Sequence, residues 1–254
     1  MKPMRTPSFR LDGKKAFVAG GSQGIGFAAA SALAEAGATV TLAARSEGSL
    51  REACATITEA GGRCDYLVLD VTDSKAVEDV FRRRADYSVV VASAGMNRPK
   101  PLAEVTDEDV HDILDLNVKS CFYLARAAVK AMVGASIPGS IILVSSQMGQ
   151  VGSPTRTLYC ASKHAVEGLT KSLAWEVGAH GIRVNTLCPT FIETPMTEPM
   201  FSRPGFREWV VERIALRRVG RMEEVMGAIA FLASDASSLM TGSALSLDGG
   251  WSAA

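Results

Sequence analysis

The sequence contains no apolar run long enough to span a membrane, and its charges balance at 27 basic and 27 acidic residues. A membrane-spanning helix needs about 18 or more mostly apolar residues, so we expect no membrane partner. Proteins that bind nucleic acid usually carry a basic excess, so we expect no nucleic-acid partner either. Segment 1–13 lacks the apolar stretch of a secretory signal.

Cysteine is sparse, with five scattered residues and no C-x-x-C pair. Disulfide frameworks and zinc sites need clustered cysteines or histidines at short, regular spacings. The pattern therefore predicts reduced thiols, a cytoplasmic location and no bound metal.

Apolar segments that read as strands alternate with helical patterns along all 254 residues. Such alternation favours a doubly wound α/β fold, with helices on both faces of a mostly parallel, seven-stranded sheet. We expect a single Rossmann-like domain over residues 1–254. The expected strands are 16–19, 39–44, 64–69, 88–92, 140–144, 182–188 and 244–247. The expected helices are 27–37, 47–60, 73–84, 106–133, 157–178 and 223–234.

A glycine-rich turn joins the first expected strand to the first helix and reads Gly20-Gly-Ser-Gln-Gly24-Ile-Gly26. Strand, glycine turn and helix together place backbone N–H groups and a helix N-terminus against a phosphate. The spacing Gly-x-x-x-Gly-x-Gly differs from the commoner Gly-x-Gly-x-x-Gly. The predicted diphosphate-binding residues of this turn are Gly20, Ser22, Gln23, Gly24, Ile25 and Gly26.

Tyr159 and Lys163 lie four residues apart, so on a helix they share one face. A free tyrosine has a pKa near ~10, and a nearby ammonium favours the phenolate. A tyrosine so placed can exchange a proton with a carbonyl or alcohol oxygen. Ser146, at the end of an expected strand, could donate a hydrogen bond to the same oxygen. Alone, the Tyr-x-x-x-Lys pair would read as an ordinary helix turn.

The glycine turn combined with Ser146, Tyr159 and Lys163 resembles the short-chain dehydrogenase/reductase family, from about residue 11 to 250. The separation of 13 residues between Ser146 and Tyr159 matches that family and distinguishes Ser146 from Ser145. The resemblance implies hydride transfer between a nicotinamide cofactor and a carbonyl or secondary alcohol. It also implies that Asn117 kinks its helix and holds a water that relays protons toward Lys163. The predicted catalytic residues are Asn117, Ser146, Tyr159 and Lys163.

The second expected strand ends at Ala44 and is followed by Arg45. NAD-binding Rossmann proteins usually carry an acidic residue at this strand's end, whereas an arginine can pair with the 2′-phosphate of NADP. The sequence therefore favours NADP(H), with NAD(H) as the alternative. The uncharged Gln23 argues the other way, because many NADP-preferring relatives have a basic residue there.

The resemblance supplies further cofactor contacts. It places the adenine ring at Asp70 and Val71 and the nicotinamide near Lys163. Two departures from the family pattern are Ser93, where asparagine is usual, and Thr190, where glycine is usual. The remaining predicted contacts are Ser93, Ala94, Gly95, Tyr159, Lys163, Ile192 and Thr194.

Segment 191–217 is rich in Met, Phe and Trp and is predicted to be a lid over a small-molecule substrate. Residues 147–152 and Thr155 mix polar and apolar side chains, which suits a sugar or polyol, a 3-oxoacyl thioester or an apolar ketone. By resemblance we expect a homotetramer packed through two long helices.

Two functions are alternatives to hydride transfer on a carbonyl or alcohol. One is a non-catalytic dinucleotide sensor of the same fold, and the other is an enoyl reductase or dehydratase.

Overall fold

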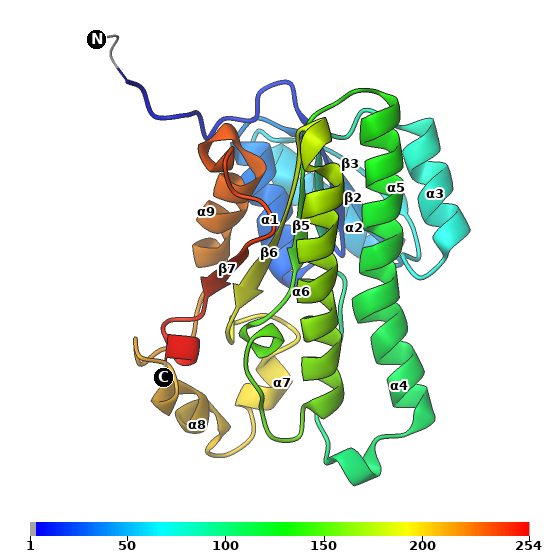
Figure 1. The fold of residues 1–254 in the computed structure, drawn as a ribbon. Helices are drawn as coiled ribbons and strands as arrows, with labels where there is room; N and C mark the ends of the chain where they lie inside the picture. The colour runs from blue at the N-terminus through cyan, green and yellow to red at the C-terminus, as the bar shows by residue number, and fades with distance from the viewer. Residues whose placement is uncertain (1–3, 254) are drawn as a thin grey trace.

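The computed structural model describes residues 4–253 and centres on one sheet of seven parallel strands (Figure 1). The strand order is β3-β2-β1-β4-β5-β6-β7, so the chain winds outward in both directions from the β1–β4 junction. This is the predicted fold class. The strands are β1 (Lys15–Ala19), β2 (Thr39–Ala44), β3 (Arg63–Val68), β4 (Val89–Ala92), β5 (Gly139–Val144), β6 (Ile182–Pro189) and β7 (Ala244–Leu247).

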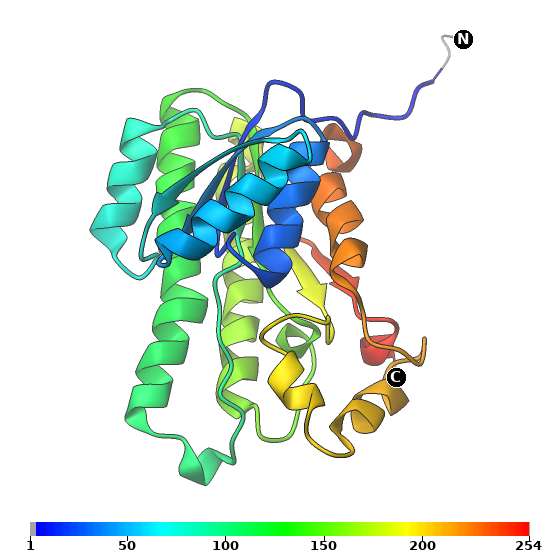
Figure 2. The ribbon, with the colours of Figure 1, turned by 180° about the vertical axis from the view of Figure 1, so that it is seen from behind.

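Helices cover both faces of the sheet. Helices α3, α5 and α6 pack on the face turned toward the viewer in Figure 1, and α1, α2 and α9 pack on the opposite face, seen in Figure 2. The α-helices are α1 (Gly24–Glu35), α2 (Glu47–Glu59), α3 (Ser74–Arg83), α4 (Asp107–Leu114), α5 (Ser120–Gly134), α6 (Thr157–Val177), α7 (Glu198–Phe201), α8 (Phe206–Glu212) and α9 (Met222–Ala233).

The central strands are buried on both faces because a helical layer covers each. In β1, Phe17 faces the α3–α5–α6 layer, and Val18 faces the α1–α2–α9 layer. Strands buried on both sides read as continuous apolar runs instead of alternating patterns. For this reason the short runs in the sequence predicted the strands to within about a residue of their observed ends.

The expected helix 106–133 is interrupted where Asn117 lies. A π turn, Asp115–Lys119, separates α4 from α5, and the Ser120 N–H donates to the Asp115 carbonyl. Single π turns inside α-helices are frequently found at functional sites. The start of α4 matches its acidic first turn, because Thr106 and Asp109 form a capping box.

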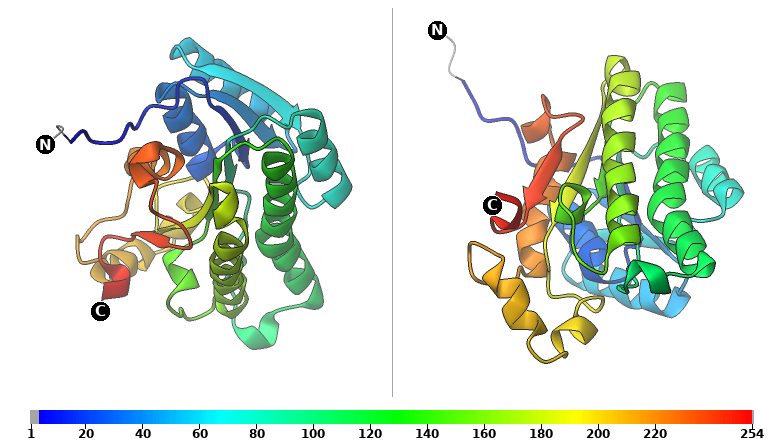
Figure 3. Two further views of the ribbon diagram at one scale, coloured as in Figure 1. Left: turned by 45° about the horizontal axis from the view of Figure 1, so that its top comes forward. Right: turned by 60° about the horizontal axis from the view of Figure 1, so that its bottom comes forward.

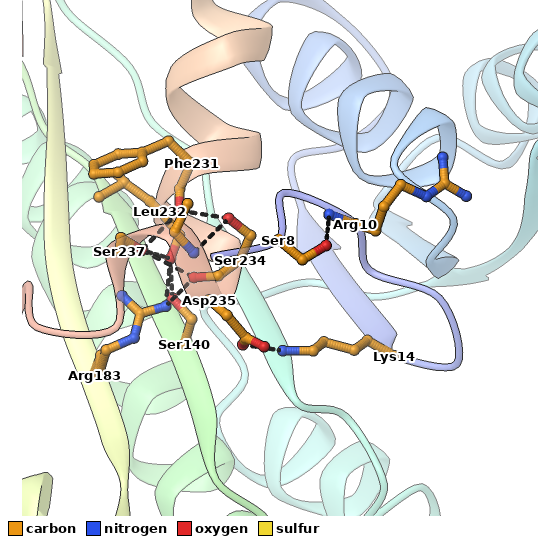
Figure 4. Close-up of polar contacts among 11 residues, drawn as sticks. Ser8, Arg10, Lys14, Ser140, Arg183, Phe231, Leu232, Ser234, Asp235 and Ser237 are labelled. Atoms are coloured by element: carbon orange, nitrogen blue, oxygen red, sulfur yellow. Dashed lines mark hydrogen bonds and ion pairs between the residues drawn. The ribbon is translucent and has the colours of Figure 1, made fainter. Parts of the chain in front are cut away.

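A polar cluster fastens α9 to the sheet at the end away from the glycine turn (Figure 4). Arg183 of β6 donates to the carbonyl oxygens of Leu232, Ser234 and Met240, and Ser140 of β5 donates to the Leu232 carbonyl at 2.7 Å. The last carbonyls of a helix lack partners within the helix, and they favour a nearby cation. This cluster satisfies them and sets the position of α9 against β5 and β6.

The predicted lid segment contains α7 and α8. Both short helices lie beyond the carboxyl end of β6, which Figure 3 (right) turns toward the viewer. Across residues 4–253, none of the helices combines the length and apolar character that crossing a bilayer requires.

Candidate active site

One cavity of about 460 Å³ opens at the carboxyl end of the central strands. In open α/β sheets, ligands bind at this edge, where the strand order reverses. The cavity is bounded by the glycine turn, the ends of β2, β4 and β5, the start of α6, and the lid segment. Every cofactor contact predicted from the sequence lines it: Gly20, Ser22, Gln23, Gly24, Ile25, Gly26, Arg45, Asp70, Val71, Ser93, Ala94, Gly95, Tyr159, Lys163, Ile192 and Thr194.

The glycine turn is tight at two points and open at a third. A Cβ on Gly26 would lie 2.1 Å from the Gly20 carbonyl oxygen, and one on Gly20 would lie 2.7 Å from the Ala94 nitrogen. At Gly24, which begins α1, the nearest atoms are the Thr194 side chain at 3.7 Å. Gln23 provides no side-chain cap to α1. The first N–H groups of α1 therefore remain available to a diphosphate, so the turn fits a dinucleotide.

Polar groups gather at the far end of the cavity, beyond β2 and β3. Exposed Arg45 follows β2, and Ser46 caps α2 by accepting from the Ser49 N–H. Asp70 accepts from the N–H and hydroxyl of Thr72, and these bonds hold the pKa of that carboxyl below its usual range. Ser46 and Ser49 also line the cavity. Sequence reasoning missed both serines, although a serine directly before a helix is a recognisable cap signal.

At the other end of the cavity, three predicted catalytic side chains line the wall, one from just after β5 and two from α6. The Lys163 ammonium lies 5.6 Å from the centre of the Tyr159 ring and donates to the Val144 carbonyl at 2.9 Å. Ser146, which is 6% exposed, donates to Gln147 Oε1 at 2.9 Å and accepts from the Met148 N–H. Tyr159, Lys163 and Ser146 all reach the cavity wall.

Asn117 lies behind the cavity wall and is fully buried. Its Oδ1 accepts from the Met96 N–H at 2.8 Å, and its Nδ2 donates to the Met96 carbonyl and to Ser162 Oγ. Ser162 in turn donates to the Tyr159 carbonyl at 2.7 Å. The Asn117 side chain thus links the loop after β4 to the turn of α6 that carries Tyr159. The expected water relay stays a prediction.

The substrate side of the cavity only partly matches the sequence-based expectation. Gln147 and Met148 line the cavity, whereas Gln150 donates toward Ser246 of β7 at 3.3 Å. Thr190, one of the departures from the family pattern, has a buried hydroxyl without a partner. Lining residues that sequence reasoning did not single out for this cavity are Met96, Asn97, Leu116, Arg156, Phe191 and Pro195.

The doubly wound sheet, the glycine turn at the start of α1 and the Tyr–Lys pair on α6 define a dinucleotide-binding oxidoreductase of the Rossmann type. A family model described as "Enoyl-(Acyl carrier protein) reductase" matches residues 19–252. The chain belongs to the short-chain dehydrogenase/reductase family and is an NAD(P)-dependent oxidoreductase acting on alcohol or carbonyl groups.

Full-length relatives support this assignment. The chain is 35% identical over 246 residues to gluconate 5-dehydrogenase of Gluconobacter oxydans, covering 95% of this chain and 96% of that protein. It is 39% identical over 245 residues to the 3-oxoacyl-[acyl-carrier-protein] reductase FabG of Thermotoga maritima, covering 95% and 98%. A gluconate 5-dehydrogenase from Burkholderia cenocepacia, solved with NADP and tartrate, superposes with a TM-score of 0.92 at 33% identity, covering 97% and 98%.

Proposed function

We propose that the protein catalyses reversible hydride transfer between NADP(H) and a carbonyl or secondary alcohol of a small molecule. The observation that carries this proposal is the convergence of Tyr159, Lys163 and Ser146 on the cavity that the glycine turn also lines. When bound, the nicotinamide supplies or accepts the hydride.

In the reducing direction, Tyr159 gives its hydroxyl proton to the substrate oxygen. The Ser146 hydroxyl, which has one proton, turns from Gln147 Oε1 and donates to the same oxygen. The Lys163 ammonium lies 5.6 Å from the centre of the Tyr159 ring, so a positive charge stands beside the phenol when it gives up its proton. The bond from Lys163 to the Val144 carbonyl fixes the ammonium in place. Asn117 supports this arrangement through Ser162.

The residues at the end of the cavity beyond β2 support a preference for NADP(H) over NAD(H). Arg45 and two hydroxyls, Ser46 and Ser49, line the wall there, and no carboxylate stands at the end of β2. An arginine and hydroxyl donors suit a 2′-phosphate. The solved gluconate 5-dehydrogenase carries NADP. Comparing kcat/KM for NADPH and NADH tests this preference, and a preference for NADH would remove it.

For the substrate, we propose a sugar acid or polyol, or a 3-oxoacyl thioester. The full-length relatives are named for gluconate and for 3-oxoacyl-[acyl-carrier-protein]. The decisive experiment is a screen of ketoses, polyols, sugar acids and acetoacetyl-CoA, following absorbance of the reduced cofactor. Binding of NADPH without turnover of any member of the panel would exclude these substrate classes.

Enoyl reduction is a second candidate because the matching family model bears that description. The four-residue separation of Tyr159 and Lys163 argues against it, since enoyl reductases of similar fold usually space these residues more widely. Parallel assays with crotonyl-CoA and acetoacetyl-CoA separate the two reactions.

The predicted lid, quaternary structure and location also remain proposals. Met196 and Met200 of segment 191–217 line the cavity, which supports closure over the substrate. The homotetramer packed through α5 and α6 is proposed from the family resemblance, and one large apolar side chain on each helix is exposed: Trp175 of α6 and Phe122 of α5. Light scattering of the wild type and of Trp175→Glu tests the assembly. The five cysteines are free thiols, which supports a cytoplasmic location.

A further inference from the structure

Arg156 is a buried arginine on the wall of the active-site cavity. It precedes α6 directly, three residues before Tyr159, and is only 6% exposed. Arginine is almost never buried without a charged partner. In the described part of the chain, the titratable groups that act on its charge are Cys160, Tyr159 and Arg203, and none of these is a carboxylate.

The contacts that Arg156 does make leave most of its hydrogen-bonding capacity unused. Its guanidinium carbon lies 5.9 Å from the ring centres of both Phe191 and Phe206. One terminal nitrogen donates to the Thr155 hydroxyl at 3.4 Å and the other to the Met200 sulfur at 3.7 Å. Nε is buried without a partner. A guanidinium has five N–H donors, so these two long bonds to neutral acceptors cannot satisfy it.

Two further observations accompany the burial of Arg156 without an anion. Desolvation lowers the pKa of Arg156. Thr155, next to it, is held at φ +62°, a conformation that a β-branched residue rarely adopts. Uncompensated buried charge and local backbone strain are typical of positions that a ligand completes.

A second unsatisfied donor lies at the same end of the cavity. Gln147 Oε1 accepts a hydrogen bond from the Ser146 hydroxyl, and Gln147 Nε2 is buried without an acceptor. Gln147 and Arg156 both line the cavity that Ser146 and Tyr159 also line, and each carries a buried N–H donor without a partner. Arg45, the arginine assigned to the cofactor phosphate, follows β2 at the other end of the cavity.

We propose that Arg156 binds an anionic group of the substrate, a carboxylate or a phosphate, so that the enzyme acts on an acid in preference to a neutral polyol or ketone. This inference rests on the proposed function, because it names the substrate class of that same site. It favours acidic compounds among the substrates considered above. Burial beside two aromatic rings strengthens the interaction of the guanidinium with an anion, since water screens that interaction little there.

Arg156 could alternatively serve only to hold the lid, through Phe191 and Phe206. Arg207 offers a matched control, because its guanidinium lies 5.2 Å from the Phe201 ring in the same aromatic group. Arg207 is exposed and already paired with Glu193 at 2.6 Å. Arg207→Gln therefore removes a lid contact without removing an unpaired cation from the cavity.

The test is calorimetric binding to the NADPH-loaded enzyme, which cannot oxidise an alcohol, with two matched probe pairs: D-gluconate against D-glucitol, and glycerol 3-phosphate against glycerol. We expect the wild type to bind one anion at least about tenfold more tightly than its neutral partner. Arg156→Gln should abolish that preference, Arg156→Lys should retain part of it, and Arg207→Gln should keep it whole. The pair that shows the preference distinguishes carboxylate from phosphate.

Equal binding of both members in each pair by the wild type overturns the inference, as does a preference that survives in Arg156→Gln. If Arg156→Gln weakened the binding of the anion and of its neutral partner equally, and Arg207→Gln did the same, the role of Arg156 would be purely structural. Turnover of neutral ketones with no anion preference would remove the acid inference alone. Failure to turn over any substrate with either cofactor would remove the proposed function instead, and calorimetry still reports anion binding.

Discussion

The ammonium of Lys163 stands 5.6 Å from the ring centre of Tyr159 and is tied to the last carbonyl of β5, that of Val144. The two residues are one turn apart on α6, and the strand fixes the outer end of the lysine. A lysine anchored in this way stays beside the Tyr159 ring and out of solvent. The catalytic predictions depend on this arrangement.

Tyr159→Phe should reduce kcat by at least about 100-fold, because it removes the proton donor and keeps the ring. Lys163 keeps its bond to Val144 in the variant, so NADPH affinity should stay within about threefold of the wild type. Stopped-flow turnover and NADPH fluorescence titration measure the two effects. Full activity in Tyr159→Phe would exclude the proposed mechanism.

Sequence reasoning located the main parts of this site because each part follows a local pattern. The glycine turn, the Tyr-x-x-x-Lys spacing and the apolar strands are all short-range features, and the fold brings them to one edge of the sheet. The family resemblance implied a kink at Asn117, but the π turn itself could not be predicted, because the sequence around it reads as continuous helix. The partners of Asn117 were hidden for another reason: Met96 and Ser162 lie 21 and 45 residues away in the chain.

Arg156 shows most clearly what the sequence does not reveal. A charged residue beside Thr, Pro and Gly is expected on an exposed loop. Its burial comes from Phe191 and Phe206, which reach it from the lid segment across the fold. Only the assembled packing shows that this charge is enclosed and faces the cavity.

Arg45→Ala should raise the KM for NADPH by roughly tenfold and leave the KM for NADH nearly unchanged. A hydrogen bond to a charged group contributes about 1.5–3 kcal/mol, and exposure of Arg45 places the effect at the low end of that range. Arg51→Ala is the control, because Arg51 is an exposed arginine of α2 outside the cavity lining. An equal rise in KM for NADPH and NADH would show that Arg45 does not bind the 2′-phosphate.

Gly26→Ala should abolish NADPH binding or unfold the first turn of α1. The added Cβ would lie 2.1 Å from the backbone oxygen of Gly20, and backbone atoms cannot move away without opening the turn. Gly48→Ala is the matched control, since that glycine is in α2 with no atom within 4 Å of the added carbon. We expect it to be neutral or stabilising by up to about 1 kcal/mol. Thermal unfolding with and without NADPH compares the two variants. Normal cofactor binding by Gly26→Ala would mean that the turn is wider than the structure shows.

We expect the stability of the fold to depend on pH through Asp109, which binds Arg98 and Lys100 of the loop that also carries Met96 and Asn97. Its carboxylate accepts from Lys100 at 2.6 Å, from Arg98 at 3.2 Å and from the Thr106 N–H at 3.0 Å. These contacts, led by the bond from Lys100, hold the pKa of Asp109 well below its usual range. A carboxyl whose pKa is lower in the folded state than in the unfolded state stabilises the fold at pH values above its unfolded-state pKa of about 4. This stabilisation is lost as the pH falls from there toward the folded-state pKa.

Asp109→Asn should therefore lower the melting temperature at pH 7, and the difference from wild type should shrink as the pH falls from about 5 to 3. Asparagine keeps an oxygen for the Thr106 N–H, so the helix cap survives and the change isolates the charge. Asp112→Asn is the control, because Asp112 pairs with the same Arg98 at 2.6 Å but is 42% exposed, and solvent weakens such pairs. Differential scanning calorimetry across this pH range measures both variants. A difference for Asp109→Asn that is independent of pH would show that the two cations do not stabilise the fold through its charge.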